Sequence, residues 1–230
     1  MSLKLIIFDL DGTLLNTLQD LADATNEALA EIGLPPLPAE DYKLLVGMGA
    51  RVLMQRSADR AMAISAKVGR PIDLVPDNDK MVDAFNRAYE PRWAGKTQPY
   101  PGIPELLTDL SGSGIQMAIL SNKPNAFTQK VAARYFPDGL FRTVFGMRPD
   151  TPGKPDPALT LEMCHLLGVL PGETAMIGDS GSDMKTAVAA GSLPVGVLWG
   201  FRSSEELSSN GARYLVKTPA ELAVLLKSLI

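Results

Sequence analysis

The sequence predicts an α/β fold in which a parallel β-sheet is covered by helices on both faces, with a helical domain inserted into the chain. Short apolar runs that stop abruptly at polar residues or glycine are typical of buried strands, and helical patterns separate several of these runs. A repeated order of strand, helix and strand favours a parallel sheet. With 230 residues, the chain is long enough for one domain and a modest insertion.

The predicted strands share one feature, which is an apolar run that ends at a polar or small residue. They are residues 3–8 before Asp9, 115–120 before Ser121, 144–147, 174–178 before Asp179, and 193–199 before Gly200. Because the four longer runs are mostly apolar and do not alternate with polar residues, we expect these strands to be buried on both faces of the sheet.

Three helical patterns lie between or after these strands, at residues 126–135, 158–167 and 183–190. The last two patterns end at Gly168 and Gly191, and glycine is the usual residue just beyond a helix C-terminus. A final helix is predicted to begin at Pro219, because Thr218 and Glu221 have the spacing of a capping box and proline is favoured at the first helical position.

A block of helical patterns without a convincing strand follows the first strand. Its helices are expected at 18–32 and around 40–46, 50–67 and 78–90. The block is too long for an ordinary loop, so it is interpreted as an inserted domain. We therefore predict a core domain of residues 1–15 and 97–230 and an inserted helical domain of residues 16–96.

Composition and charge exclude several classes of protein. Hydrophobic residues make up 46% of the chain, which is enough for a full core, and the net charge is -4 with no long basic block, so a nucleic-acid partner is not expected. No run approaches the roughly 20 apolar residues of a membrane span, so no membrane partner is expected. The single cysteine, Cys164, forms no internal disulfide, and no signal peptide is recognised, so we expect a cytoplasmic protein.

Four polar clusters are expected at the carboxyl ends of the predicted strands, where ligands bind in open parallel sheets. They are Asp9-Leu10-Asp11-Gly12-Thr13, Ser121-Asn122-Lys123, Lys154-Pro155 and Gly178-Asp179-Ser180-Gly181-Ser182-Asp183. Each cluster alone has a simpler explanation: Asp9 and Asp11 fit a turn, Ser121 fits a helix start, and Lys154 fits a solvated loop.

Together the clusters fit phosphoryl transfer. Asp9 and Asp11 follow a mostly apolar run one residue apart, and two such carboxylates are costly to bring together unless a cation neutralises them. Carboxylate oxygens favour magnesium over zinc, and Asp179 would add another such ligand. Lys154 lies between a glycine and a proline, and a residue before proline favours an extended backbone. We therefore expect a fixed loop that holds the lysine ammonium in one direction. A metal ion, a lysine, a hydroxyl donor and a carboxylate nucleophile are what phosphoryl transfer needs.

The order of DLDGT, SNK, GKPDP and GDSGSD resembles the four motifs of the haloacid dehalogenase superfamily of phosphohydrolases, from Asp9 to Asp183. The Ser-Asn-Lys-Pro run, the GDSxxDxxxAxxAG run and the segment Val197-Leu198-Trp199-Gly200-Phe201 look most like the phosphoglycolate phosphatase branch. The resemblance implies a Rossmann-like core and a magnesium-dependent phosphatase acting on a small phosphorylated metabolite, present as a monomer or homodimer.

The resemblance also implies a role for each motif residue. Asp9 would be the nucleophile that forms an aspartyl-phosphate, and Asp11 would protonate the leaving alcohol and then deprotonate the attacking water. Ser121 would hold phosphoryl oxygens, and Lys154 would stabilise the nucleophile and the transferred charge. The residues implied to bind phosphate are Gly12, Thr13, Ser121, Asn122 and Lys154. The residues implied to bind magnesium are Asp9, Asp11, Asp179 and Asp183. Of these, Asp11 would use its backbone carbonyl, and Asp183 would orient the other ligands of the metal.

Residues 16–96 resemble the type of cap domain inserted after the first motif in this superfamily, which excludes water and selects the leaving group. Within this segment, Gly47-Met48-Gly49-Ala50-Arg51 is either a loop whose Arg51 pairs with a substrate carboxylate or a turn with a surface arginine. Lys123 is expected either to contact the substrate or to begin a helix.

Several alternatives stay open within the superfamily. A sugar phosphomutase such as one resembling β-phosphoglucomutase, a pyrophosphatase and a nucleotide phosphatase would all use the same aspartyl-phosphate chemistry. Dehalogenase activity is disfavoured, because Asp11 has no use in displacing a halide from carbon. A phosphate-binding regulatory protein is a further alternative outside the enzymes. Asn16 departs from the acidic residue found in many relatives, which puts substrate choice or cap hinging in doubt more than catalysis.

Overall fold

The structure is a computed structural model that describes residues 2–230, and these form two compact units. Unit 1 comprises residues 2–16 and 99–230, and unit 2 comprises Thr17–Gln98. No helix within residues 2–230 is long and apolar enough to cross a membrane.

Unit 1 is built on a six-stranded sheet with the order β5-β4-β1-β6-β7-β8, in which every neighbouring pair is parallel. This arrangement confirms the predicted α/β class with a parallel sheet. The strands are β1 (Leu5–Phe8), β4 (Gln116–Pro124), β5 (Thr143–Met147), β6 (Thr174–Gly178), β7 (Leu193–Val197) and β8 (Tyr214–Val216).

Strand β1 lies in the middle of the sheet and defines its carboxyl edge. Its last residue, Phe8, is opposite Ile119 of β4 and Ile177 of β6. All four residues of β1 are buried, as the apolar run predicts. The residue that follows, Asp9, therefore leaves the sheet between two neighbouring strands, and its backbone N–H donates to the carbonyl of Ile177 at 2.8 Å.

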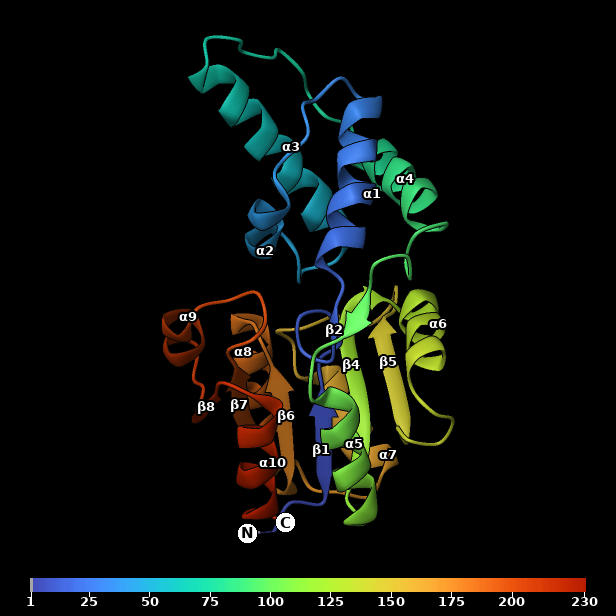
Figure 1. Ribbon diagram of the computed structural model, residues 1–230, viewed down its shortest axis with the longest axis vertical. Helices are drawn as coiled ribbons and strands as arrows, with labels where there is room; N and C mark the ends of the chain where they lie inside the picture. Colours follow the sequence, from blue (N-terminus) through green and yellow to red (C-terminus); the bar gives the residue numbers. More distant parts are fainter. Residues whose placement is uncertain (1) are drawn as a thin grey trace. The chain divides into compact units, whose positions relative to one another are not determined.

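Helices cover both faces of the sheet. Figure 1 shows α5 (Ile103–Gly112) and α10 (Pro219–Lys227) on one face, and α7 (Ala158–Leu166) and α8 (Gly181–Ala190) on the other. The second pair packs against the sheet in one apolar cluster, which includes Leu5, Ile7, Met163, Cys164 and Ala187. Helix α6 (Asn125–Tyr135) packs against β4 and β5, and α9 (Ser204–Ser209) lies between β7 and β8 in the chain.

Several predicted elements are confirmed and a few differ. The last helix begins at Pro219 with the predicted cap, since the Thr218 hydroxyl accepts a hydrogen bond from the Glu221 N–H at 3.1 Å. Strand β4 is longer than predicted and continues through Ser121 to Pro124, so the interpretation of Lys123 as the start of a helix is wrong. Helix α6 begins only at Asn125.

Unit 2 is helical, with α1 (Leu18–Glu31), α2 (Tyr42–Leu45), α3 (Ala50–Lys67), α4 (Asn78–Tyr89) and a 3-10 turn at Ala39–Asp41. These elements confirm the helices predicted from the apolar spacing. The short strands β2 (Leu15–Asn16) and β3 (Gln98–Pro99) pair with each other where the chain passes from one unit to the other.

A buried carboxylate joins the two ends of unit 2. Asp20 in the first turn of α1 is only 2% exposed. Its Oδ2 accepts hydrogen bonds from the backbone N–H groups of Lys96 and Thr97, at 2.9 and 2.8 Å, and from the Thr97 hydroxyl at 2.7 Å. The helix that opens the unit is thereby fixed to the segment that closes it.

We expect Asp20→Ala to lower the free energy of unfolding by about 2–4 kcal/mol, because it leaves two backbone N–H groups without their charged acceptor. The matched control is Asp23→Ala. Asp23 pairs with the Lys96 ammonium at 2.6 Å, and this lysine side chain is 59% exposed, so its loss is expected to cost less than about 1 kcal/mol. Urea denaturation measures both values, and equal losses would contradict the role given to Asp20.

Candidate active site

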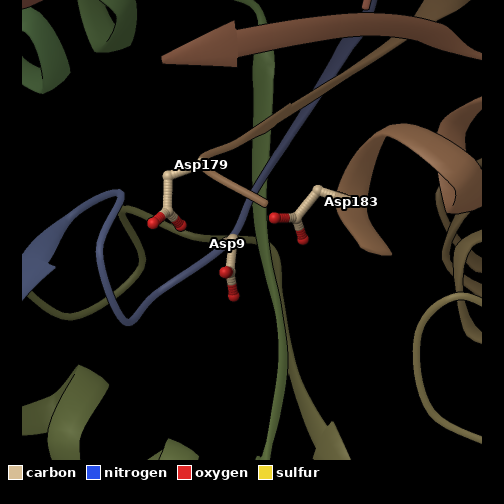
Figure 2. A group of neighbouring side chains, drawn as sticks. All are labelled: Asp9, Asp179 and Asp183. Carbon is tan, nitrogen blue, oxygen red and sulfur yellow. The ribbon is translucent and has the colours of Figure 1, made fainter. Parts of the chain in front are cut away.

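Three buried carboxylates meet at the carboxyl edge of the sheet. Asp9 follows β1, Asp179 follows β6, and Asp183 lies in the first turn of α8. Figure 2 shows these side chains gathered around one point, and they offer ligand atoms that all lie within 4.8 Å of one another. The Asp11 side chain is not part of this group, although the sequence analysis assigned Asp11 to the metal site through its backbone carbonyl.

Lys154 is the cation at the centre of this site. Its ammonium lies 2.7 Å from Asp9 Oδ1 and 2.6 Å from Asp183 Oδ1, and it donates to the backbone carbonyl of Leu120 at 3.0 Å. An ammonium has three hydrogens, so these contacts use all of its donors. The geometry therefore brings together Asp9, Lys154 and Asp183 from three distant parts of the sequence.

The pKa values of these groups are set by burial and by each other. Burial lowers the pKa of Lys154, but Asp183 and Asp9 outweigh it, so the pKa lies above its usual value. Burial is also the largest influence on Asp9 and raises its pKa well above normal, against the opposing effect of Lys154. For Asp179, burial and the neighbouring Asp183 raise the pKa to about 7. One lysine among three buried carboxylates leaves an excess of negative charge, which favours a bound cation.

Asp179 is held between two loops that approach it closely. Its Oδ2 accepts a hydrogen bond from the Phe201 N–H at 2.7 Å, and its Oδ1 accepts one from the Thr13 hydroxyl at 3.2 Å. A Cβ atom at Gly12 would lie 2.3 Å from Asp179 Oδ2, and one at Gly200 would lie 2.3 Å from Asp179 Cβ. Because neither glycine has a side chain, there is room for the Asp179 carboxylate between them.

Asp183 is fixed from both sides. Its Oδ2 accepts hydrogen bonds from the backbone N–H of Ser180 at 3.0 Å and from the Ser180 hydroxyl at 2.7 Å, while its Oδ1 faces Lys154. A Cβ atom at Gly178 would lie 2.3 Å from the Asp183 side chain. Asp183 thus pairs with Lys154 through one oxygen and caps the start of α8 through the other.

Ser121 and Asn122 lie at the end of β4, next to the loop that carries Lys154. The Asn122 amide donates to the backbone carbonyl of Lys154 at 2.9 Å. A Cβ atom at Gly153 would lie 2.4 Å from Asn122 Oδ1, so a glycine is needed where this loop passes the asparagine. Ser121 is 2% exposed, and its hydroxyl accepts a hydrogen bond from the Lys123 N–H at 3.1 Å.

Lys123 is a site residue whose partner the sequence analysis did not find. Its ammonium lies 3.2 Å from Asp11 Oδ2, and the two side chains are only 5% and 12% exposed. The available signal was its position two residues beyond Ser121, together with the rule that a buried lysine needs a carboxylate partner.

Arg202 was also missed. Its side chain is 9% exposed, and its Nε lies 3.4 Å from Glu206 Oε1, which accepts a hydrogen bond from the Gly181 N–H at 3.1 Å. Its positive charge opposes the burial that raises the pKa of Asp179. The signal in the sequence was its place shortly after Gly200, in the loop that follows β7, the strand next to β6.

Arg51 lies in unit 2, near the start of α3. Its guanidinium pairs with the Asp79 carboxylate, and its side chain is 63% exposed. The preceding glycines both have positive φ angles, 114° at Gly47 and 83° at Gly49, a conformation that glycine adopts without strain.

This edge of the sheet carries a buried carboxylate that contacts a lysine, further carboxylates able to hold a cation, and a serine and an asparagine beside them. The model of the haloacid dehalogenase-like hydrolase family matches residues 6–197. The chain belongs to this family.

Curated relatives narrow the class further. The chain is 34% identical to a phosphoglycolate phosphatase from Haemophilus influenzae, over 97% of this chain and 98% of that protein. It is 32% identical to a phosphoglycolate phosphatase from Psychrobacter arcticus, over 90% and 88% of the two chains. The protein is therefore a phosphoric monoester hydrolase similar to the phosphoglycolate phosphatases, and the alternative of a regulatory protein without activity is not retained.

The fold agrees with this class. The crystal structure of a predicted phosphoglycolate phosphatase from Haemophilus somnus superimposes with a TM-score of 0.87 at 29% identity, and the match covers 98% of both chains.

We expect Gly12→Ala to lower phosphatase activity by at least about 10-fold, because the new methyl group displaces the Asp179 carboxylate. The matched control is Gly114→Ala. Gly114 also has a positive φ, 80°, but its Cβ would meet open space, so it carries the backbone strain without the clash. Steady-state kinetics and thermal unfolding of both variants separate the two effects. Equal loss of activity in both would mean that strain, and not the clash, is responsible.

Proposed function

We propose that this protein is a magnesium-dependent phosphatase that hydrolyses a small phosphate monoester, similar to phosphoglycolate, through an aspartyl-phosphate on Asp9. The observation that carries the proposal is the contact between buried Asp9 and Lys154 beside two further carboxylates. The names of the curated relatives support phosphoglycolate as the substrate class.

The donor set fits a hard divalent cation. Asp9, Asp179 and Asp183 offer only carboxylate oxygens, and no histidine or cysteine joins them among the described residues. We propose that Asp9, Asp179 and the backbone carbonyl of Asp11 hold Mg²⁺, with Asp183 orienting the site. Bound there, the ion would neutralise the charge that gathers on the phosphoryl oxygens.

In the first step, Asp9 attacks phosphorus. Its Oδ1 accepts hydrogen bonds from the Leu10 N–H and from Lys154, both at 2.7 Å, which leaves Oδ2 for the attack. The bond between Oδ2 and phosphorus forms while the bond between phosphorus and the leaving oxygen breaks. Asp11 gives its proton to the leaving oxygen, so the product of this step is a neutral alcohol.

In the second step, water attacks the phosphorus of the aspartyl-phosphate. Asp11, now a carboxylate, takes a proton from the water, the bond between Asp9 and phosphorus breaks, and inorganic phosphate leaves. Throughout both steps, Gly12, Thr13, Ser121 and the backbone N–H of Asn122 hold the phosphoryl oxygens, and the positive charge of Lys154 stabilises the charge that is transferred.

We propose that unit 2 is the cap domain that selects the leaving group. Arg51 is its candidate for pairing with a substrate carboxylate, and Asp79 is the carboxylate that a substrate would replace. The pyrophosphatase and nucleotide phosphatase alternatives use the same chemistry at Asp9 and differ in the leaving group that the cap accepts. The mutase alternative forms the same aspartyl-phosphate but returns the phosphoryl group to the substrate instead of to water. The cytoplasm as compartment and a monomer or homodimer as the assembly stay predictions.

The first test is Mg²⁺-dependent phosphate release from 2-phosphoglycolate, hexose phosphates, nucleotides and pyrophosphate. We expect a preference for 2-phosphoglycolate that is lost after chelation of the metal. Asp9→Asn is expected to lower turnover by at least about 10³-fold without unfolding the protein, because an amide is a poor nucleophile. The matched control is Asp109→Asn, which changes an aspartate that is 52% exposed and pairs with Lys227. Normal turnover by Asp9→Asn would refute the nucleophile, and a preference for another ester would refute the substrate class.

A second test concerns the cap. We expect Arg51→Ala to raise KM for 2-phosphoglycolate about 10-fold, because a charge-assisted hydrogen bond to its carboxylate is lost, and to change KM little for esters with an uncharged alcohol. Arg56→Ala removes another exposed arginine of α3 and is the control. An equal change for charged and uncharged esters would remove Arg51 from substrate recognition.

A further inference from the structure

Asp11 and Lys123 form a second buried ion pair at the carboxyl edge of the sheet, separate from the contacts of Lys154. The distance from Lys123 Nζ to Asp11 Oδ2 is 3.2 Å. Lys154, by contrast, contacts Asp9 and Asp183. The site thus holds two lysines, one beside the proposed nucleophile and one beside the proposed acid and base.

We propose that Lys123 is a positioning residue that holds Oδ2 of Asp11 and thereby presents Oδ1 to the leaving oxygen of the substrate. This inference rests on the proposed function, because it assigns a support to the proton-transferring group named there. It differs from both sequence expectations for Lys123, since the residue neither contacts the substrate nor begins a helix in this account.

The two oxygens of Asp11 have different surroundings. Oδ2 faces the ammonium of Lys123, whereas Oδ1 is buried and has no hydrogen-bond partner among residues 2–230. A buried polar atom without a partner costs free energy, so such atoms are often found where a ligand supplies the missing contact. An ammonium has only donors, so Oδ2 is occupied as the acceptor of the Lys123 ammonium. Oδ1 is therefore the oxygen that is left for the substrate.

The backbone of Lys123 is fixed on both sides, which suits a residue that positions another. Its N–H donates to the Ser121 hydroxyl at 3.1 Å, and its carbonyl accepts a hydrogen bond from the Thr128 hydroxyl at 3.1 Å. A Cβ atom at Gly146 would lie 2.6 Å from that carbonyl, so the neighbouring strand β5 also packs closely against it. The ammonium is thus carried by a rigid segment of β4.

The test compares two esters that differ in their need for an acid. The alcohol that leaves from 2-phosphoglycolate must be protonated, whereas nitrophenolate leaves from p-nitrophenyl phosphate without help. We expect Lys123→Met to lower kcat/KM for 2-phosphoglycolate by about 10²-fold and to change kcat/KM for p-nitrophenyl phosphate by less than about 3-fold. Lys123→Arg, which keeps the charge, is expected to recover part of the loss.

A double-mutant cycle with Asp11→Asn completes the test. If Lys123 acts through Asp11, Lys123→Met adds no further loss once the carboxylate has been removed. Independent losses that multiply, or equal losses on the two esters, would overturn the proposal, because they mean that Lys123 acts on the phosphoryl group or on the fold. The matched control is Lys130→Met, which removes an exposed lysine from α6 and should leave both reactions unchanged.

The cycle also distinguishes failure of the inference from failure of the proposed function. The quantity compared is kcat/KM, because it reports formation of the aspartyl-phosphate and not its hydrolysis, in which Asp11 acts as base for both esters. If Asp11→Asn itself lowers kcat/KM equally for both esters, Asp11 is not the acid of the first step, and the proposed function and the inference fall together. If Asp11→Asn shows the expected difference between esters and Lys123→Met does not, only the inference is overturned. Thermal unfolding is measured for every variant, and Lys123→Gln replaces Lys123→Met if the latter does not fold.

Discussion

The ammonium of Lys154 is the contact on which the rest of the site depends. It joins a carbonyl of β4, the first residue after β1 and the first turn of α8. The two carboxylates, Asp9 and Asp183, approach each other closely because this cation lies between them. A buried charge that loses its partner is costly, so removal of the lysine would leave both carboxylates without compensation. The contacts of Lys154 thus contribute both to the stability of this edge of the sheet and to the arrangement of the site.

Space around the carboxylates is the second constraint. Gly12, Gly178 and Gly200 each leave a place that an aspartate side chain fills. Two of these glycines belong to the motifs that also supply the aspartates. Gly178 and Gly200 are needed for room and not for a left-handed backbone, since they do not have positive φ angles, whereas Gly12 has a φ of 90° in addition to its close contact. Close packing of this kind holds each carboxylate at a fixed position.

The sequence predicted those parts of the molecule where a short stretch of residues has a pattern typical of a single kind of element, such as an apolar run for a buried strand. The strands β1 and β6 are short apolar runs buried completely and followed by an aspartate, so their ends and the site residues were predicted together. Lys154 was predicted from its place between Gly153 and Pro155 and from the resemblance of GKPDP to a family motif. The ends of the strands are determined by burial, and burial is what an apolar run reports.

Other parts were not predicted, for different physical reasons. Strand β8 has only three residues, two of them half-buried, so its apolar run is too short to recognise. Helix α5 was overlooked although Ile103, Leu106, Leu107 and Leu110 have helical spacing and are buried. The partner of Lys123 is distant in sequence, and no local pattern indicates which carboxylate this lysine will meet. The partner of Arg202 lies four residues on in the chain, but this spacing does not indicate that the arginine is near Asp179.

The order of the strands in the sheet has a consequence for how the protein matures. Thr13 and Asp179, which contact each other, lie 166 positions apart in the chain, and β1 is completed only when β6 pairs with it. A nascent chain therefore emerges from the ribosome with Asp9 long before Asp179 and Asp183 exist. During that interval β1 has a free edge and Asp9 lacks Lys154, so the group of carboxylates is complete only after β6 and the start of α8 have been made.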